Sequence, residues 1–394
     1  MMRKVQMLDL HREYQYMQAE IDEALKRCLN HQQWIFGPEV KELENQLTQY
    51  LGCTHCIGTS SGTDALVVVL RALANKLKGQ EYFDRSDGII TTPFTFTATG
   101  DAILRAGATP VFVDIHPATC NINPAGIREY LACSKAQPAT GLHAVGIIPV
   151  HLYGQSCHMD EIMAIAKEFD LFVLEDVAQA FGASWDSKKL GTIGTAGAFS
   201  FFPSKNLGGF GDGGMVCTDD DELAETMRML IKHGGRDKYN VDHIGYNARI
   251  DTLQAAILLV KLRYIDEFNK RRTNVASLYS SALKGIDGLV LPRTDYSSSV
   301  AKMDHVFHQF TIQVLNGRRD GLRDHLAANM VDTMVYYPVP LHKMGVFQGR
   351  SRVAGQLDQA ERASAEVLSL PIEPLEEEET FTSVVGLIKD FLES

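Results

Sequence analysis

The stretch Ala198-Phe-Ser-Phe-Phe-Pro-Ser-Lys205-Asn-Leu-Gly-Gly-Phe-Gly-Asp-Gly-Gly214 joins an apolar segment to a single lysine and a run of glycines. Residues 196–202 are apolar enough for a buried strand, which Pro203 ends. Five of the seven residues 208–214 are glycine, which permits unusual backbone conformations and close approach to a ligand. A lysine at this point can be partly desolvated, which lowers the pKa of its amine and favours nucleophilic or Schiff-base chemistry. On this stretch alone, a surface lysine packed over a turn fits slightly better.

Segments upstream of Lys205 alternate between predicted strands and predicted helices. The expected strands are residues 89–92, 109–115, 145–150, 171–174 and 196–202, with 215–218 after the lysine, and the expected helices are residues 97–105, 124–133 and 158–169. This alternation is typical of βαβ units, so we expect an α/β fold with a mainly parallel central sheet flanked by helices. Ligands of such sheets bind at the carboxyl ends of the strands. The candidate loops are therefore residues 91–96, 151–154, 175–179 and the lysine loop.

The two ends of the chain have a more helical pattern. Helices are expected at residues 15–29, 38–51, 221–233, 318–330 and 376–391, with a long helix from 251 to about 283, and strands at 306–315 and 333–337. We therefore expect a large α/β domain over residues 1–250, with an N-terminal arm over about the first 30 residues, and a smaller C-terminal α+β domain over residues 251–394 that begins with the long helix.

Composition narrows the class of protein. The chain has 394 residues, is 45% hydrophobic and 22% charged, and carries a formal net charge of -11, which argues against nucleic acid and anionic membranes as partners. Its seven cysteines are scattered and odd in number, so reduced thiols are expected. Cys53-Thr-His-Cys56 has the spacing of half a zinc site, but without a second half two buried structural cysteines and no metal are expected. The first ten residues lack the apolar stretch of a signal peptide, so the expected compartment is the cytoplasm.

The glycine run also contains a misleading motif. Residues 209–214 match the dinucleotide-binding pattern G-x-G-x-x-G. That pattern requires a helix after the glycines, whereas the apolar run Met215-Val-Cys-Thr predicts a strand. A nicotinamide cofactor is therefore rejected.

Two upstream features complement Lys205. Asp176 follows a predicted buried strand, and the polar residues 59–64 precede an apolar run that continues as a helix. A helix N-terminus rich in glycine and hydroxyl groups suits a phosphate, although a plain capped helix fits the segment equally well. Asp176 alone is more typical of a helix cap or a loop acid. Together, Lys205, Asp176 and Ser61-Gly62-Thr63 offer an amine, a carboxylate for a pyridinium nitrogen and a phosphate cradle, which pyridoxal 5′-phosphate requires.

These residues belong to a longer series of segments in which the chain resembles the DegT/DnrJ/EryC1/StrS family of sugar aminotransferases, within the fold-type I pyridoxal phosphate enzymes. The matching segments are Phe36-Gly-Pro-Glu-Val40, Gly58-Thr-Ser-Ser-Gly-Thr-Asp-Ala-Leu66, Pro93-Phe-Thr-Phe-Thr-Ala-Thr99, Gly107-Ala-Thr-Pro-Val-Phe-Val-Asp114, Pro149-Val-His-Leu-Tyr-Gly154, Glu175-Asp-Val-Ala-Gln179, Phe199-Ser-Phe-Phe-Pro-Ser-Lys-Asn206, Gly245-Tyr-Asn-Ala-Arg-Ile-Asp251 and Leu368-Ser-Leu-Pro-Ile372. The resemblance covers nearly the whole chain and implies a fold-type I transferase.

The resemblance implies a role for individual residues. Lys205 is expected to form the Schiff base with pyridoxal phosphate and to act as the catalytic acid/base, and Asp176 to pair with the pyridine nitrogen. The remaining cofactor contacts implied are Gln179 near the 3-hydroxyl, Phe96 stacked on the ring, Gly62, Thr63 and Ser200 at the phosphate, and Asn247 at the phosphate of a neighbouring subunit. Two chains would then share each site, as a homodimer.

The resemblance also implies an activity. Lysine rather than histidine at position 205 implies transamination, with an amino acid such as L-glutamate as donor and a sugar carbonyl as acceptor. A nucleotide-linked keto-hexose is the expected acceptor, for cell-surface polysaccharide such as lipopolysaccharide or for related amino-sugar synthesis. A sugar acid such as an oxidised octulosonate is the alternative, and a cofactor-binding regulatory protein without turnover is the rival class. Trp34, Tyr336, His342 and Lys343 are weak candidates for substrate contact, and residues 77–86 have no assigned role.

Overall fold

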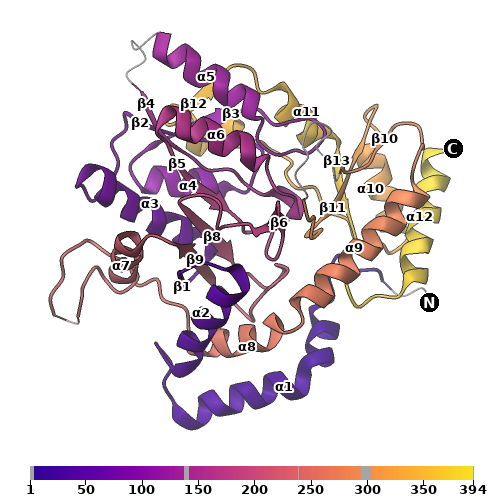
Figure 1. Cartoon of the computed structure of the whole chain (residues 1–394). Coiled ribbons are helices and arrows are strands. Elements are labelled where there is room, and N and C mark those ends of the chain that lie inside the picture. Colours follow the sequence, from indigo (N-terminus) through magenta and orange to yellow (C-terminus); the bar gives the residue numbers. More distant parts are fainter. Residues whose placement is uncertain (1–3, 137–141, 238, 294–302, 394) are drawn as a thin grey trace.

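The computed structural model describes residues 4–136, 142–237, 239–293 and 303–393, so the first three residues of the expected N-terminal arm lie outside it. Its α-helices are α1 (Leu10–His31), α2 (Pro38–Leu51), α3 (Gly62–Lys78), α4 (Thr97–Arg105), α5 (Pro124–Ala136), α6 (Met159–Phe169), α7 (Asp221–Leu230), α8 (Thr252–Leu262), α9 (Ile265–Ala282), α10 (Arg319–Ala328), α11 (Asp358–Glu366) and α12 (Glu378–Leu392). Its strands are β1 (His55–Thr59), β2 (Asp87–Thr91), β3 (Thr109–Val113), β4 (His143–Ile147), β5 (Phe172–Asp176), β6 (Ser184–Trp185), β7 (Lys188–Lys189), β8 (Ala196–Ser200), β9 (Gly214–Thr218), β10 (Leu289–Val290), β11 (Phe310–Val314), β12 (Arg352–Ala354) and β13 (Val367–Leu370). Short 3₁₀ turns lie at Leu152–Gly154, Leu341–Lys343 and Gly345–Phe347. Figure 1 shows their arrangement.

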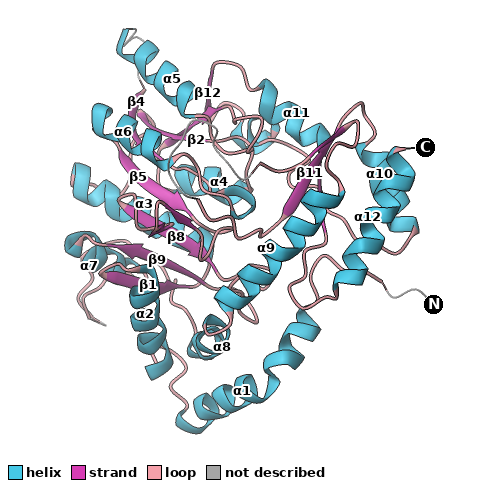
Figure 2. Cartoon of the chain, turned by 45° about the vertical axis from the view of Figure 1, so that its right-hand side comes forward, coloured by secondary structure: helices cyan, strands magenta, loops and turns pink. Residues whose placement is uncertain are grey.

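An eight-stranded sheet forms the centre of the larger part of the molecule, in the order β1-β9-β8-β5-β4-β2-β3-β12 (Figure 2). The pairs from β8 to β12 are parallel, and β9 alone runs antiparallel to its neighbours β1 and β8. The prediction of a mainly parallel α/β sheet is confirmed. The carboxyl ends of β5 and β8 therefore lie side by side, which places the loops after Asp176 and Ser200 next to each other.

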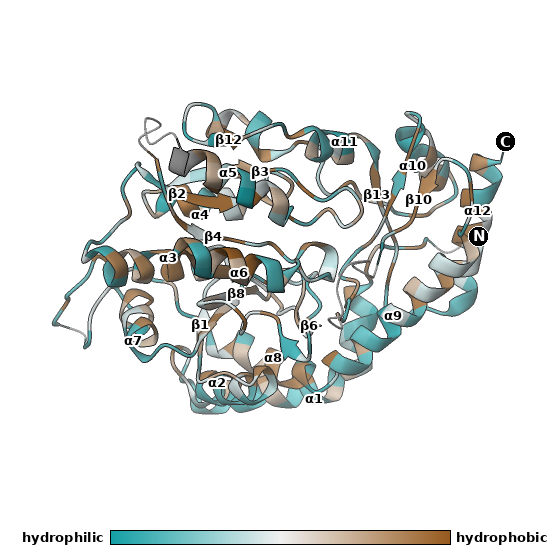
Figure 3. Ribbon diagram, turned by 45° about the horizontal axis from the view of Figure 1, so that its top comes forward, coloured by the Kyte–Doolittle hydropathy of each residue, from teal (hydrophilic) through white to brown (hydrophobic). Residues whose placement is uncertain are grey.

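Helices cover both faces of this sheet because its strands alternate between two apolar cores. On β8, Phe199 faces a core shared with α2, α5, α6 and α8, whereas Ala196 and Ala198 face a core shared with α3, α4 and α7. In Figure 3, β2 is coloured mainly as hydrophobic, and α3 shows both hydrophobic and hydrophilic bands. Burial on both faces explains why these strands appear in the sequence as continuous apolar runs.

The C-terminal part adds a second, smaller layer. The antiparallel sheet β10-β11-β13 packs with α9, α10 and α12 around an apolar core of its own. β12 instead pairs with β3 in the large sheet, and α8 packs against α1 and α2. The domain boundary near residue 250 stays a prediction. No helix in the described ranges is long and apolar enough to cross a membrane.

Two predicted elements differ in the structure. The long helix expected from residue 251 is divided into α8 and α9. The N–H groups of Arg263 and Tyr264 donate to Val260 O (3.2 Å) and Lys261 O (3.0 Å), three residues back, in place of the four-residue spacing of an α-helix. The strand expected at 333–337 is wrong. Only Met334 pairs with a strand there, through Ser369, since the chain then turns towards the loops at the carboxyl ends of the large sheet.

Candidate active site

The lysine loop is a compact hydrogen-bonded turn. Lys205 N donates to Phe202 O (2.8 Å), and Gly209 N donates to Phe201 O (2.7 Å). None of the five loop glycines has a positive φ. Gly208 is required for close approach instead, because a Cβ there would lie 2.4 Å from Pro203 O. The glycines therefore serve packing of the loop rather than unusual backbone angles, and β9 follows them, which confirms the rejection of the dinucleotide motif.

Lys205 and Asp176 lie at the ends of adjacent strands and influence each other's charge. Burial lowers the pKa of the Lys205 amine to about 8, against the opposing effect of the Asp176 carboxylate. Burial raises the pKa of Asp176, although Thr99, the Ala178 N–H and Lys205 each oppose the rise. Thr99 Oγ1 donates to Asp176 Oδ2 (2.9 Å), and Ala178 N donates to Oδ1 (3.2 Å). The site thus holds an amine that is readily deprotonated beside a buried acid that is held in one orientation.

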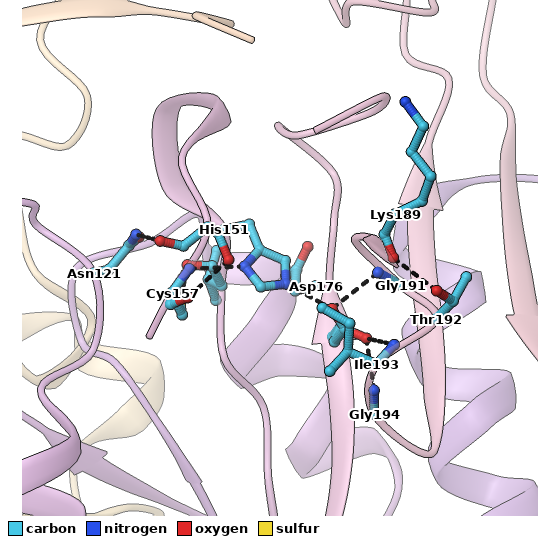
Figure 4. A network of polar contacts seen from close by, with 12 residues as sticks. Asn121, His151, Cys157, Asp176, Lys189, Gly191, Thr192, Ile193 and Gly194 are labelled. Carbon is cyan, nitrogen blue, oxygen red and sulfur yellow. Dashed lines mark hydrogen bonds and ion pairs between the residues drawn. The ribbon is translucent and has the colours of Figure 1, made fainter. Parts of the chain in front are cut away.

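A fully buried network lies behind Asp176 (Figure 4). Cys157 N donates to His151 Nδ1 (3.1 Å), so the neutral imidazole carries its proton on Nε2 and donates it to Glu175 Oε2 (3.0 Å). Glu175 also accepts from the N–H groups of Gly191, Ile193 and Gly194 at 2.8–2.9 Å. His151 N donates to Asp176 O (3.0 Å). The network fixes the strand end that carries Asp176, and neither His151 nor Glu175 was singled out from the sequence.

Gly62, Thr63 and Ser200 form one surface. Gly62 and Thr63 begin α3, so their N–H groups have no partner within the helix. Ser61 caps α3 by accepting from Asp64 N (3.1 Å). A Cβ at Gly62 would lie 2.6 Å from Ser200 Cβ, so the helix start and the end of β8 touch. Free N–H groups and a hydroxyl at a helix N-terminus provide a cradle for a phosphate.

Gln179 and Phe96 both lie close to Tyr337. Gln179 Oε1 accepts from Tyr153 N (2.8 Å), and its Nε2 donates to Tyr337 Oη (2.8 Å). The Phe96 ring is 59% exposed and lies 6.3 Å from the ring of Tyr337. Burial raises the pKa of Tyr337, so the phenol stays protonated. Tyr337 was missed in the sequence because its segment was interpreted as a strand.

Asn206 ties the lysine loop to the smaller sheet. Its Nδ2 donates to Asn269 Oδ1 on α9 (2.7 Å) and to Val306 O (3.2 Å). Its Oδ1 lies 3.0 Å from His308 Nδ1. Burial, together with the positive charges of Lys205 and Arg272, lowers the pKa of His308, so the ring is neutral and Nδ1 is the donor. The only sequence signal for this contact was the matching segment that ends at Asn206.

Asn247 is exposed and follows a loop that residues 77–86 hold in place. These residues had no role assigned from the sequence. On α3, the fully buried Arg71 side chain donates to Glu81 Oε2 (2.6 Å) and to Ile244 O (3.0 Å). Glu81 Oε1 lies 3.0 Å from His243 Nδ1. Burial opposes ionisation of Glu81, but His243 and Arg71 outweigh it and lower its pKa. Residues 77–86 therefore position the chain that leads to Asn247.

The weak substrate candidates are dispersed. Trp34 is 41% exposed near Thr252, whose N–H donates to Trp34 O (3.0 Å). Tyr336 lies at the site, where its backbone oxygen accepts from the Tyr153 hydroxyl. His342 and Lys343 both pair with Glu361, at 3.0 and 2.6 Å. The structure thus groups Tyr336 with the site, whereas His342 and Lys343 contact Glu361 on α11.

One group in the described ranges has metal-ligand chemistry: Cys28, His31 and Glu39. Gln33 N donates to His31 Nδ1 (3.0 Å), which leaves the proton of the neutral ring on Nε2, 3.1 Å from Glu39 Oε1. A metal ion bound to Nε2 of the neutral ring would require the ring proton on Nδ1. That proton would then point at the Gln33 N–H, which needs an acceptor there. The trio is a hydrogen-bonded cluster rather than a metal centre.

The residues fit pyridoxal phosphate, since an amine with a lowered pKa, a buried carboxylate and a phosphate cradle meet at one strand edge. Comparison with known proteins agrees. The family model described as the DegT/DnrJ/EryC1/StrS aminotransferase family matches residues 15–389.

Individual relatives cover nearly the whole chain. A "Pleiotropic regulatory protein" of Geobacillus stearothermophilus is 43% identical over 98% of both chains. The dTDP-3-amino-3,4,6-trideoxy-alpha-D-glucose transaminase of Streptomyces venezuelae is 37% identical over 99% of this chain and 97% of its own. The crystal structure of NtdA from Bacillus subtilis with bound cofactor PMP is 31% identical, with a TM-score of 0.86 over 100% of this chain and 86% of that one. This chain belongs to the DegT/DnrJ/EryC1/StrS aminotransferase family.

Proposed function

We propose that this aminotransferase, which uses pyridoxal 5′-phosphate, moves an amino group from an amino acid, with L-glutamate as the expected donor, to a carbonyl of a nucleotide-linked keto-hexose. The observation that carries the proposal is the desolvated Lys205 amine beside the buried Asp176 carboxylate. Both the deoxy-sugar transaminase among the relatives and the phosphate cradle at α3 support it.

The residues would divide the work as follows. When bound, pyridoxal phosphate supplies an aldehyde that takes up amino groups and a ring that accepts an electron pair. Asp176 would hold a proton on the ring nitrogen, because the carboxylate is oriented by Thr99 and Ala178. Lys205 would hold the aldehyde carbon until the donor amine replaces it. Its freed amine, with a pKa near 8, would then move the proton between the two reacting carbons.

Further side chains would orient the cofactor. Gly62, Thr63 and Ser200 would bind the phosphate through N–H and hydroxyl groups, and Gln179 would lie beside the 3-hydroxyl. The exposed face of Phe96 would stack on the ring. Tyr336 and Trp34 remain candidates for the sugar.

The proposal includes a homodimer. Apolar side chains near the lysine loop are exposed, among them Phe36 (51%), Phe202 (51%) and Phe210 (46%), as is Ile244 (63%) on the loop before Asn247. If Asn247 acts in the neighbouring site, a mixture of Lys205→Ala and Asn247→Ala chains regains activity, because one site in each mixed dimer is intact. If Asn247 acts within its own chain, every mixed dimer has two damaged sites and no activity returns.

A location in the cytoplasm and a role in polysaccharide synthesis, lipopolysaccharide included, belong to the same proposal. The seven free cysteines support a reducing compartment.

Turnover separates this proposal from a regulatory role, which the name of the Geobacillus relative suggests for that protein. The aminated enzyme is incubated with nucleotide-linked 3-keto and 4-keto hexoses and with an oxidised octulosonate, and return of the aldehyde absorbance is followed. Rapid return with a nucleotide-linked sugar is expected, and Lys205→Ala is the control. Return with the octulosonate alone would replace the proposed acceptor. No return with any sugar and no reaction with glutamate would refute the enzyme.

A further inference from the structure

Three cysteines gather at the edge of the large sheet, at the end of β1 remote from the phosphate cradle. Cys53 precedes β1, Cys56 lies on it, and Cys217 is the direct partner of Cys56 on β9. The cradle begins at Ser61, beyond the opposite end of β1. The proposed aminotransferase reaction uses none of these thiols.

The three thiols differ in access. Cys53 is partly exposed, whereas Cys56 and Cys217 are 1% and 0% exposed. The Sγ atoms of Cys53 and Cys56 are 3.6 Å apart. The Cys217 thiol donates to Gly191 O (3.0 Å). One sulfur is therefore open to a reagent from solution, and a second, shielded sulfur lies in contact with it.

The contacts also divide the thiols by acidity. The neighbouring Cys217 and Cys56 thiols lower the pKa of Cys53, against burial and the Asp219 carboxylate. The hydrogen bond to Cys53, together with burial, raises the pKa of both Cys56 and Cys217. An accessible thiolate beside a protonated, buried thiol is the arrangement that thiol–disulfide exchange requires.

We propose that Cys53 and Cys56 form a thiol–disulfide site that is oxidised by small disulfides such as glutathione disulfide. The Cys53-Thr-His-Cys56 spacing, the contact between the two sulfurs and the access to Cys53 alone carry this assignment. A disulfide bond is about 2.05 Å long, so the two sulfurs must approach by about 1.5 Å.

The exchange has two steps. The Cys53 thiolate attacks one sulfur of glutathione disulfide, the S–S bond breaks, and glutathione leaves as a thiolate. Cys56 then loses its proton and attacks Cys53 Sγ, which expels the second glutathione. The two cysteines are oxidised and glutathione disulfide is reduced to two glutathione molecules: one takes the Cys56 proton, and the other takes a proton from solvent.

The full-length holoenzyme is incubated with glutathione disulfide, then unfolded in urea, blocked with N-ethylmaleimide and digested with trypsin. Cys53 and Cys56 share the peptide of residues 42–71, Cys217 lies in 206–228, and the exposed Cys133 lies in 129–135. We expect peptide 42–71 to lose both maleimide labels and two hydrogens, and dithiothreitol to restore them. Cys53→Ser should abolish the loss, and the matched variant Cys133→Ser should leave it unchanged.

The proposal is overturned if peptide 42–71 keeps both labels under conditions that modify Cys133. It is also overturned if Cys53→Ser loses label as fast as the wild type, since the partly exposed Cys53 is then not the attacking thiol. In Cys56→Ser the reaction should stop at a glutathione adduct on Cys53. A folding defect in that variant does not affect the test, because Cys53→Ser changes a side chain outside the strand.

Discussion

Replacing Lys205 by methionine should stabilise the cofactor-free protein while abolishing its activity. A pKa lowered from 10.5 to about 8 means that folding disfavours the charged amine. At about 1.4 kcal/mol per pH unit this corresponds to about 3 kcal/mol at neutral pH. This value already includes the favourable interaction with the Asp176 carboxylate, which opposes the lowering of the Lys205 pKa.

The sign of the pH dependence makes the prediction specific. The unfolded chain binds more protons than the folded one between pH 8 and 10.5, so wild-type stability rises with pH in that window. The advantage of Lys205→Met should therefore fall to about 2 kcal/mol by pH 9. Urea unfolding of both cofactor-free proteins at pH 7 and 9, at one protein concentration, measures it.

The matched control is Lys188→Met, since Lys188 is exposed on β7 and its charge stays hydrated. It should change stability little at either pH. Equal stability of Lys205→Met and the wild type at pH 7, or a gain that does not change with pH, would refute desolvation as the origin of the lowered pKa.

Three further predictions concern residues around the site. Thr99→Val removes the donor to Asp176 Oδ2, so the pKa of Asp176 should rise further. The acid limb of the pH–rate profile should then move to higher pH. An acid limb that does not move contradicts the role of Asp176. Gly62→Ala places a Cβ 2.6 Å from Ser200 Cβ. It should weaken cofactor binding, measured by titration, by about 1–3 kcal/mol. Gly345→Ala is the control, because its Cβ would lie in open space and cofactor binding should not change. Glu81→Gln leaves the buried Arg71 without its charge partner and should lower the free energy of unfolding by about 1–3 kcal/mol. If the stability and the hydrogen exchange of the loop before Asn247 are both unchanged, Glu81 does not hold that loop.

The sequence predicts best what depends on local pattern. The βαβ alternation predicted the parallel sheet, and Pro38 lies at the first turn of α2, a local effect that the structure reproduces. The strand expected to end at Pro203 ends earlier, at Ser200. The short β12 was missed because its three residues are specified by pairing with β3 rather than by their own pattern. Tyr337 was missed for the converse reason: an apolar run looked like a strand, but tertiary contacts with Gln179 and the Phe94 ring determine its position.

The candidate site shows the same division at the level of charge. The sequence contains the amine of Lys205 and the carboxylate of Asp176, yet their pKa values are set by neighbours that come from distant segments. The buried His308 next to Asn206 must be neutral, and His151, which accepts from Cys157 N and donates to Glu175, places no second cation behind Asp176. A cation at either place would compete for the Asp176 carboxylate, which then would have less charge to offer a ring nitrogen. The buried His308 beside the lysine loop therefore adds no positive charge, which keeps the lysine reactive and the aspartate available.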